Sequence, residues 1–364
     1  MMKICIVAGA RPNFFKIAPL LRAAKETDVE MSLVYTGKDD DPTLEHGLFE
    51  ELAIKHPDAY LGVDSNNLNE ITAQVMFRFD QYLHTHPTDT VIVVDDLAST
   101  MAVAIVTKKQ GITLAHLSAG TRSFNIKMPK EVNRIVIDGL SDILFTAGMS
   151  NNSIANREGA ALSKVYMVGN LLTDNIRADR LRYVRPAWLD ELAVEDGNYF
   201  VLTLNRRVLL EDKETLSALI HRLAATAAHT PIIAPLQPEA MAVLKQLPAM
   251  PNLHLVAPLG YLTFGYLAEH AKGIITDSDN VAEEATFRNV PCITLNTYAE
   301  HIETVTVGSN LLVGTDAEAL AQAVTQLLEG NWKTAHIPDR WDGRSAERIL
   351  QILTAPHNTP AATN

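Results

Sequence analysis

The sequence predicts an α/β protein made of two Rossmann-like domains with a cleft between them. Short continuous apolar runs alternate with amphipathic stretches along the whole chain. That alternation is typical of parallel strands covered by helices on both faces. A charged stretch divides the strands into two series, and 364 residues suffice for two hydrophobic cores.

The first series of elements forms the expected N-terminal domain, residues 1–170. Apolar runs predict strands at residues 3–8, 31–35, 90–94, 113–116, 143–146 and 165–168. Between them, amphipathic stretches predict helices at residues 15–25, 99–109 and 150–158.

The second series follows a connection at residues 171–198, which is rich in arginine and contains Pro186. Its apolar runs predict strands at residues 199–204, 231–234, 254–256, 273–275 and 292–295. These belong to an expected C-terminal domain, residues 199–340. Residues 341–364 are expected to form a terminal helix at 345–353 and a disordered tail from Pro356 to Asn364.

Charge and composition narrow the classes of partner. The net charge of −12 argues against nucleic acid and against an anionic membrane surface, because both select clustered lysine and arginine. Cys5 and Cys292 lie in apolar runs, which favours small buried hydrophobes, and neither has a ligand at metal-site spacing. We therefore expect no metal and no cofactor. With no signal-peptide core and no apolar run of membrane-spanning length, a cytoplasmic protein is expected.

Polar residues follow two strands of the first series. After the first strand, Gly9-Ala10-Arg11-Pro12 allows either an anion contact by Arg11 or a tight turn with a solvated arginine. Asp95 and Asp96 end another strand, and an acid beside a second acid can transfer protons. Capping of the next helix is the equal alternative.

A polar cluster around residues 116–134 suits an active-site loop. For His116, which ends a strand, a buried and hydrogen-bonded core histidine is slightly favoured over a catalytic one. Glu131 and Arg134 stand at helical spacing and can pair with each other.

The segment from Thr276 to Glu284 follows an apolar strand and opens a helix, which is where open α/β sheets hold ligand phosphates. Asp279 lies in that turn, where its charge would oppose a diphosphate. The alternative is that Asp279 or Ser278 simply caps the helix.

Together these segments resemble the non-hydrolysing UDP-N-acetylglucosamine 2-epimerase family. The matching segments cover nearly the whole chain in order and are residues 9–12, 16–19, 116–123, 128–134, 168–170, 258–261, 276–284 and 313–316. The resemblance implies a GT-B-like fold, a nucleotide-sugar ligand, a homodimer and a reaction that eliminates UDP and adds it back after C2 is reprotonated. That reaction needs acid/base groups and donors for the diphosphate.

The resemblance also assigns roles to residues. Asp96, Glu131 and Arg134 are the implied catalytic residues, and the implied substrate-binding residues are Arg11, Ser278, Glu283, Glu284 and His301. Five family positions differ. Ser118 and Lys130 replace glutamates, Asn205 replaces a histidine, and Asp279 and Asn280 replace a glycine pair. Either Glu283 or Glu284 is suited to ribose hydroxyls.

Three functions are consistent with this pattern. The first is a nucleotide-sugar 2-epimerase with a rebuilt site, in which Asp96 transfers protons while Arg11 and His301 lie near the phosphates. The second is a paralogue that has lost the reaction and keeps a binding or regulatory role. The third is a different reaction on a less anionic ligand.

Overall fold

The structure is a computed structural model that describes residues 2–44, 47–158 and 164–355. Its contacts divide the chain into two compact units. Unit 1 comprises Met1–Ala147, Asn151–Asp174 and Asp342–Asn364, and unit 2 comprises Gly148–Ser150 and Asn175–Trp341. The tail expected from Pro356 lies outside the described residues.

Unit 1 is built on a seven-stranded parallel sheet with the order β3-β2-β1-β4-β5-β6-β7. In chain order the strands are β1 (Met2–Ala8), β2 (Val29–Tyr35), β3 (Ala59–Tyr60), β4 (Thr90–Val94), β5 (Thr113–Leu117), β6 (Ile143–Thr146) and β7 (Lys164–Met167). The strand order reverses between β1 and β4. In open α/β sheets ligands bind beyond the carboxyl ends of the strands at such a reversal.

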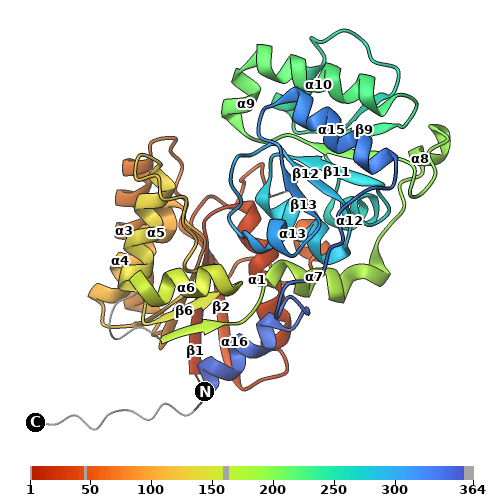
Figure 1. Cartoon of the computed structure of the whole chain (residues 1–364). Helices are drawn as coiled ribbons and strands as arrows, with labels where there is room; N and C mark the ends of the chain where they lie inside the picture. The colour runs from red at the N-terminus through yellow and green to blue at the C-terminus, as the bar shows by residue number, and fades with distance from the viewer. Residues whose placement is uncertain (1, 45–46, 159–163, 356–364) are drawn as a thin grey trace, which may run out of the picture. The chain divides into compact units, whose positions relative to one another are not determined.

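Helices cover this sheet. They are α1 (Arg11–Ala24), α2 (Leu48–Glu51), α3 (Leu68–Thr85), α4 (Ala98–Lys109), α5 (Pro129–Leu140), α6 (Met149–Glu158) and α16 (Ser345–Thr354), with α7 (Leu171–Asp179) continuing into unit 2. Helices α3, α4 and α5 pack consecutively over the face that carries Cys5 and Val7 (Figure 1). Cys5 is fully buried there, which confirms its interpretation as a small hydrophobe.

Unit 2 has a six-stranded parallel sheet with the order β10-β9-β8-β11-β12-β13. Its strands are β8 (Phe200–Thr203), β9 (Ile232–Pro235), β10 (Leu253–Val256), β11 (Gly273–Thr276), β12 (Cys292–Thr294) and β13 (Asn310–Leu312). The order reverses between β8 and β11. Cys292 is fully buried in this sheet, as its apolar neighbours predicted.

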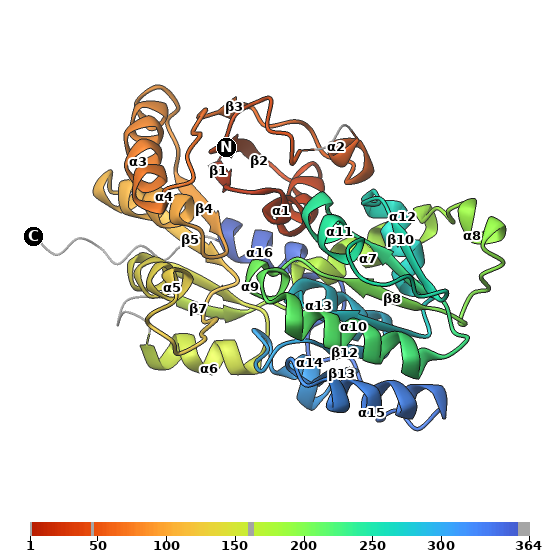
Figure 2. The ribbon, with the colours of Figure 1, turned by 90° about the horizontal axis from the view of Figure 1, so that it is seen from above.

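The α-helices of unit 2 lie in two layers. They are α8 (Trp188–Glu191), α9 (Arg207–Glu211), α10 (Lys213–Ala227), α11 (Pro238–Leu244), α12 (Tyr261–Glu269), α13 (Asp279–Arg288), α14 (Glu303–Thr306) and α15 (Ala317–Leu328), beside the short 3-10 helix η1 (Arg180–Arg182). Helices α10 and α15 pack side by side over one face (Figure 2), and α12 and α13 share the core of the other.

Two details of the first turns differ from expectation. Helix α1 begins at Arg11 instead of residue 15, because the Asn13 Oδ1 accepts the N–H groups of Gly9 and Ala10 at 2.9 and 3.1 Å. Capping of α4 by Asp95 or Asp96 was wrong. The N-cap is Leu97, which makes no side-chain capping bond among the described residues, and both carboxylates bond elsewhere.

Candidate active site

Asp95 is held by α1 at the reversal point of the unit 1 sheet. Lys16 Nζ lies 2.7 Å from Asp95 Oδ1, and Asn13 Nδ2 donates to Oδ2 at 2.9 Å. Burial alone would raise the pKa of Asp95, but the Lys16 ammonium and the Ser118 hydroxyl bring it below its ordinary value. Asp95 has φ of 58° and Ser118 has φ of 66°, a strained conformation for both that is common at functional sites.

Asp96, the next residue, is held by α5. Its Oδ2 accepts a hydrogen bond from Arg134 Nε at 2.8 Å and lies 2.7 Å from Arg134 Nη2. Lys130 Nζ is 3.3 Å from Oδ1. Asn133 Nδ2 donates to the Asp96 carbonyl at 2.8 Å. Two cations on successive turns of one helix therefore hold the same carboxylate.

Glu131 faces the preceding loop. Its carboxylate accepts the N–H groups of Ser123 and Phe124 at 2.8 and 3.0 Å and the Ser123 hydroxyl at 2.9 Å. Arg134 lies 3.4 Å away, which confirms the expected pairing. Burial opposes ionisation, yet these donors lower the pKa of Glu131. In this arrangement Glu131 fixes the loop, and its predicted part in proton transfer stays a prediction.

His116 and Arg11 complete this group of predicted residues. His116 is buried, with both ring nitrogens hydrogen-bonded, which confirms the core-histidine interpretation. The Arg11 guanidinium lies 5.2 Å from the centre of the Phe15 ring, a cation–π distance. Its predicted contact with an anion is not tested by this geometry.

In unit 2 the turn after β11 is organised by Asp277. Its carboxylate accepts the N–H groups of Asn205 and Arg206, which follow β8, at 2.9 and 2.8 Å. Burial raises the pKa of Asp277, and these donors moderate the rise. Asp277 thus ties together the two strand ends where the sheet order reverses.

Ser278, Asp279 and Asn280 start α13. Ser278 is the N-cap residue but makes no side-chain capping bond among the described residues. Asp279 Oδ1 accepts the Glu300 N–H at 3.2 Å, so it does not act as a simple cap. Burial, followed by the charges of Glu300 and Glu283, raises the pKa of Asp279 to about 7. Near neutral pH this group therefore carries only part of the negative charge predicted from the sequence.

The acids of α13 differ in their surroundings. Glu283 is buried, with Oε1 3.6 Å from His301 Nε2, and the His301 ring packs edge-on against Trp341. Glu284 lies 3.1 Å from Arg288 Nη1. Burial raises the pKa of Glu284, and Arg288 offsets part of that rise. His301 and Glu283 therefore lie together, and their role in substrate binding stays a prediction.

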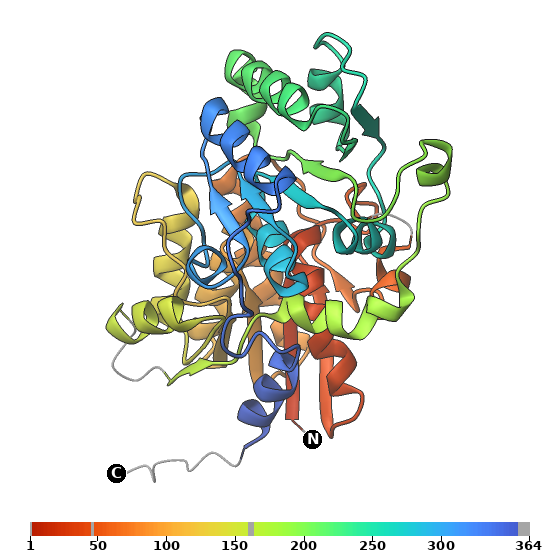
Figure 3. The same ribbon diagram turned by 45° about the vertical axis from the view of Figure 1, so that its right-hand side comes forward.

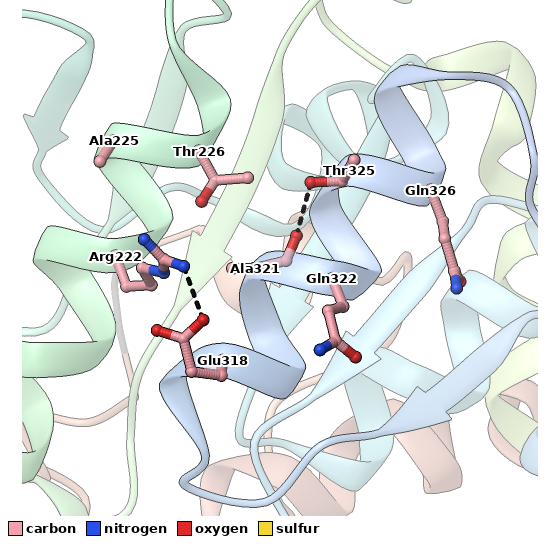
Figure 4. A pocket seen from close by; sticks show the side chains of 8 residues that line it. All are labelled: Arg222, Ala225, Thr226, Glu318, Ala321, Gln322, Thr325 and Gln326. Carbon is pink, nitrogen blue, oxygen red and sulfur yellow. Dashed lines mark hydrogen bonds and ion pairs between the residues drawn. The ribbon is translucent and has the colours of Figure 1, made fainter.

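A hollow of about 550 Å³ opens on the helical layer of unit 2 (Figure 4). It lies between α10 and α15, and Arg222 pairs with Glu318 across it at 2.6 Å. None of the predicted site residues lines it. Elsewhere in the described part of the chain, no group of three or more acids, histidines or cysteines is placed to hold a metal ion. Over the same residues, no helix is long and apolar enough to cross a membrane.

Comparison with known proteins identifies the family. The model of the UDP-N-acetylglucosamine 2-epimerase family matches residues 22–354. The chain belongs to this family. It is 34% identical over 370 residues to a UDP-N-acetylglucosamine 2-epimerase of Methanocaldococcus jannaschii, covering 97% of this chain and 99% of the relative. It is 30% identical to a UDP-2,3-diacetamido-2,3-dideoxy-D-glucuronate 2-epimerase of Pseudomonas aeruginosa, with 88% and 91% covered.

Solved structures of the family have the same fold. The M. jannaschii enzyme in complex with UDP-GlcNAc and UDP superposes with a TM-score of 0.86 at 32% identity, and 97% of this chain and 99% of that one are covered. Two parallel sheets with these neighbours confirm the GT-B-like α/β fold expected from the sequence. The family match and these relatives also confirm the expected nucleotide-sugar 2-epimerase-like function.

Sequence reasoning missed two residues that the structure brings into the unit 1 cluster. Lys16 binds Asp95, and Asp138 binds His116 at 2.6 Å. A signal for Asp138 was present, because Glu131, Arg134 and Asp138 recur at helical spacing and face the same side of α5. No signal in the sequence could pair Lys16 with Asp95, because 79 residues separate them.

Proposed function

We propose that this chain is a nucleotide-sugar 2-epimerase-type isomerase acting on a UDP-linked 2-acetamido sugar. The observation that carries the proposal is the retained Asp96, presented at the reversal point of the unit 1 sheet and held by Arg134. The relatives named above act on UDP sugars, and one was solved with UDP-GlcNAc and UDP. Both sheets carry polar residues at their reversal points, where ligands of open α/β sheets bind.

In the proposed reaction Asp96 accepts the C2 proton. The C2–H electron pair forms a C1–C2 double bond while the C1–O bond breaks, and UDP leaves with the C1–O electron pair. Proton return to the opposite face of C2 and re-addition of UDP give the epimer. Donors must hold the departing diphosphate, and we assign this role to Arg11 and His301, with Ser278 beside them on the sequence pattern. Glu283 or Glu284 would bind ribose hydroxyls.

A second function, ligand binding without turnover, is favoured by one observation. Lys130 stands 3.3 Å from Asp96, at a position where the family resemblance implies a glutamate. Ser118 and Asn205 likewise replace an implied glutamate and histidine, neither of which they match in proton transfer at neutral pH. With Arg134 and Lys130 both on Asp96, the site could hold a sugar without moving its proton.

Incubation with UDP-GlcNAc in deuterated buffer separates the two functions. Deuterium at C2 with formation of the 2-epimer supports the isomerase, and Asp96→Asn should then lower the rate about a hundredfold or more. Asp316→Asn, a change at an exposed helix cap, is the matched control. A thermal shift with UDP but no exchange identifies a binding protein. If neither occurs, the UDP-sugar proposal is wrong.

Lys130→Glu tests the role of the substituted position. If Lys130 limits proton transfer, this variant should speed C2 exchange, because it removes a cation from Asp96 and restores the implied carboxylate. An unchanged or slower rate would show that Lys130 does not limit the reaction.

We also propose that the chain forms a homodimer. Helix α5 buries its polar face, with Glu131, Arg134 and Asp138, and exposes Val132 and Ile135 to 41% and 45%. Apolar side chains on the open face of a helix are typical of a protein interface. Light scattering should report a dimer for the wild type and a monomer for Ile135→Glu, whereas Ile337→Glu, at an exposed site of unit 2, should leave the dimer intact. A wild-type monomer would overturn this proposal.

A further inference from the structure

His116 bridges two acceptors inside unit 1. The ring is only 2% exposed. Nδ1 lies 2.6 Å from Asp138 Oδ1 on α5, and Nε2 lies 2.9 Å from the Asp95 carbonyl oxygen at the end of β4. A neutral imidazole has one N–H and one lone pair, so it can donate to only one of two acceptors.

The ionisation state of Asp138 decides how many protons the His116 ring must carry to hydrogen-bond with both acceptors. Its Oδ2 lies 2.7 Å from Arg122 Nη1 and accepts the Gly120 N–H at 3.1 Å. Burial would raise the pKa of Asp138, but His116 and Arg122 lower it below its ordinary value. The contacts with the Arg122 guanidinium and the Gly120 N–H favour Asp138 as a carboxylate, which accepts at both oxygens, and the carbonyl of Asp95 cannot donate at all. Both nitrogens of His116 must then donate.

The charged groups around the bridge form ion pairs of their own. Arg122 Nε also pairs with Glu158 on α6 at 2.9 Å, and Arg157 Nη2 lies 3.6 Å from the same carboxylate. On the other side of the bridge Asp95 pairs with Lys16, and Asp96 pairs with Arg134 and Lys130. The positions of the two acceptors around the His116 ring therefore carry the assignment of its protons.

The bridge ends on the peptide that precedes the proposed catalytic carboxylate. The Asp95 carbonyl and the Asp96 N–H belong to the same peptide group, and Asp95 has φ of 58°, so this turn is held against its intrinsic preference. Helix α5 contributes Asp138 to the bridge and Arg134 to Asp96. His116 thus links the turn to the helix that also holds its side chain.

We propose that His116 is a buried imidazolium that fixes the Asp95–Asp96 peptide and thereby acts as a positioning residue for Asp96. The catalytic part of this statement rests on the proposed function, whereas the protonation state and the backbone effect do not. Deprotonation would set a lone pair against one of the two acceptors and release the turn. Loss of the bridge should therefore lower turnover without an equal loss of nucleotide binding.

Nitrogen-15 NMR of the full chain tests the protonation state directly. The sequence contains 12 histidines. At pH 7 one ring should show protons on both nitrogens, and its signals should vanish in His116→Gln and remain in the control His254→Gln. A His116 ring with a bare Nδ1 at pH 7 would overturn the proposal.

The amide signal of Asp96 tests positioning without reference to activity. Relative to the wild type, this signal should move in both His116→Gln and Asp138→Asn, because each substitution breaks the bridge. If the ring carries both protons but the Asp96 amide signal stays unchanged in these variants, the positioning role is wrong. In an active protein His116→Gln should lower kcat about tenfold with UDP affinity retained. Loss of UDP affinity with unchanged kcat would contradict the role.

Discussion

At the scale of single residues, two buried aspartates in the two units differ in pKa because their charged neighbours differ. Asp95 is stabilised as an anion because Lys16 and Ser118 outweigh burial. Asp279 has acidic neighbours, and its pKa rises to about 7. The same residue type is therefore a fixed charge at one sheet reversal and a titrating group at the other. Sequence alone shows two aspartates after two strands and does not distinguish them.

Asp279 should make stability depend on pH. Its pKa in the folded state is about 7, above the unfolded value of about 3.9, so the folded protein binds more protons between those values. Its stabilising contribution is thus complete below about pH 4 and is lost as pH rises to about 7. Relative to wild type, Asp279→Asn should gain on the order of 2 kcal/mol in unfolding free energy between about pH 5 and pH 8.

Urea denaturation at the two pH values measures this gain. Asp316→Asn keeps a helix cap at an exposed site and should show no such pH-dependent gain. An equal free-energy difference between Asp279→Asn and wild type at both pH values would contradict the raised pKa.

At the scale of elements, the turns that follow the strands place the site residues. Helix α1 starts early because Asn13 closes the turn after β1, and the turn after β5 passes close to α6. Gly120, in that second turn, has φ of 75°, and a Cβ there would lie 2.1 Å from the Asn151 carbonyl oxygen. The close approach of two backbones, together with the left-handed φ, requires glycine at this position.

Gly120→Ala should therefore destabilise the protein by more than its backbone conformation alone predicts. Gly111 is the matched control, with φ of 71° and nothing within 4 Å of an added Cβ. The left-handed conformation should cost each alanine variant about 1 kcal/mol, and overpacking should cost Gly120→Ala about 1–3 kcal/mol more. Urea denaturation of both variants checks this, and equal losses would show that the turn moves freely away from α6.

At the scale of the whole molecule, unit 1 is completed by the last helix of the chain. Helix α16 packs against α1, and the N–H groups of Ser345 and Ala346 donate to Asp174 at 3.1 and 2.8 Å. Figure 3 shows the dark blue α16 beside the red N-terminal elements. The sequence from Asn175 to Trp341, which belongs to unit 2, separates these contacts along the chain. Unit 1 can therefore be complete only after unit 2 and helix α16 have been made.

A cavity under α16 should weaken unit 1 selectively. Ile349 is fully buried, and Ile349→Ala should cost about 2–5 kcal/mol. Hydrogen exchange should quicken in α1 and in the strands of unit 1, with α10 and α15 of unit 2 unchanged. The control Ile337→Ala, 49% exposed, should alter neither unit. Uniformly faster exchange in both units would show instead that they unfold together.

Local patterns in the sequence were enough to predict the fold class, the positions of most strands and the residue types at their ends. Apolar runs identify buried parallel strands, and polar residues must follow where such strands leave the core. It named Asp96, Glu131, Arg134 and His116, and the pairing of Glu131 with Arg134 followed from helical spacing. These features depend on neighbours close in the chain, so a local pattern suffices to predict them.

What each side chain faces follows from contacts between residues far apart in the sequence. Lys16 meets Asp95 across 79 residues, Arg134 meets Asp96 across 38, and His116 meets two acceptors from separate elements. Ionisation follows from these distant partners and from burial, because charge interactions depend on distance in space and on exclusion of water. That is why the sequence identified the acids of the candidate site, while the fold set the charge that Asp279 carries.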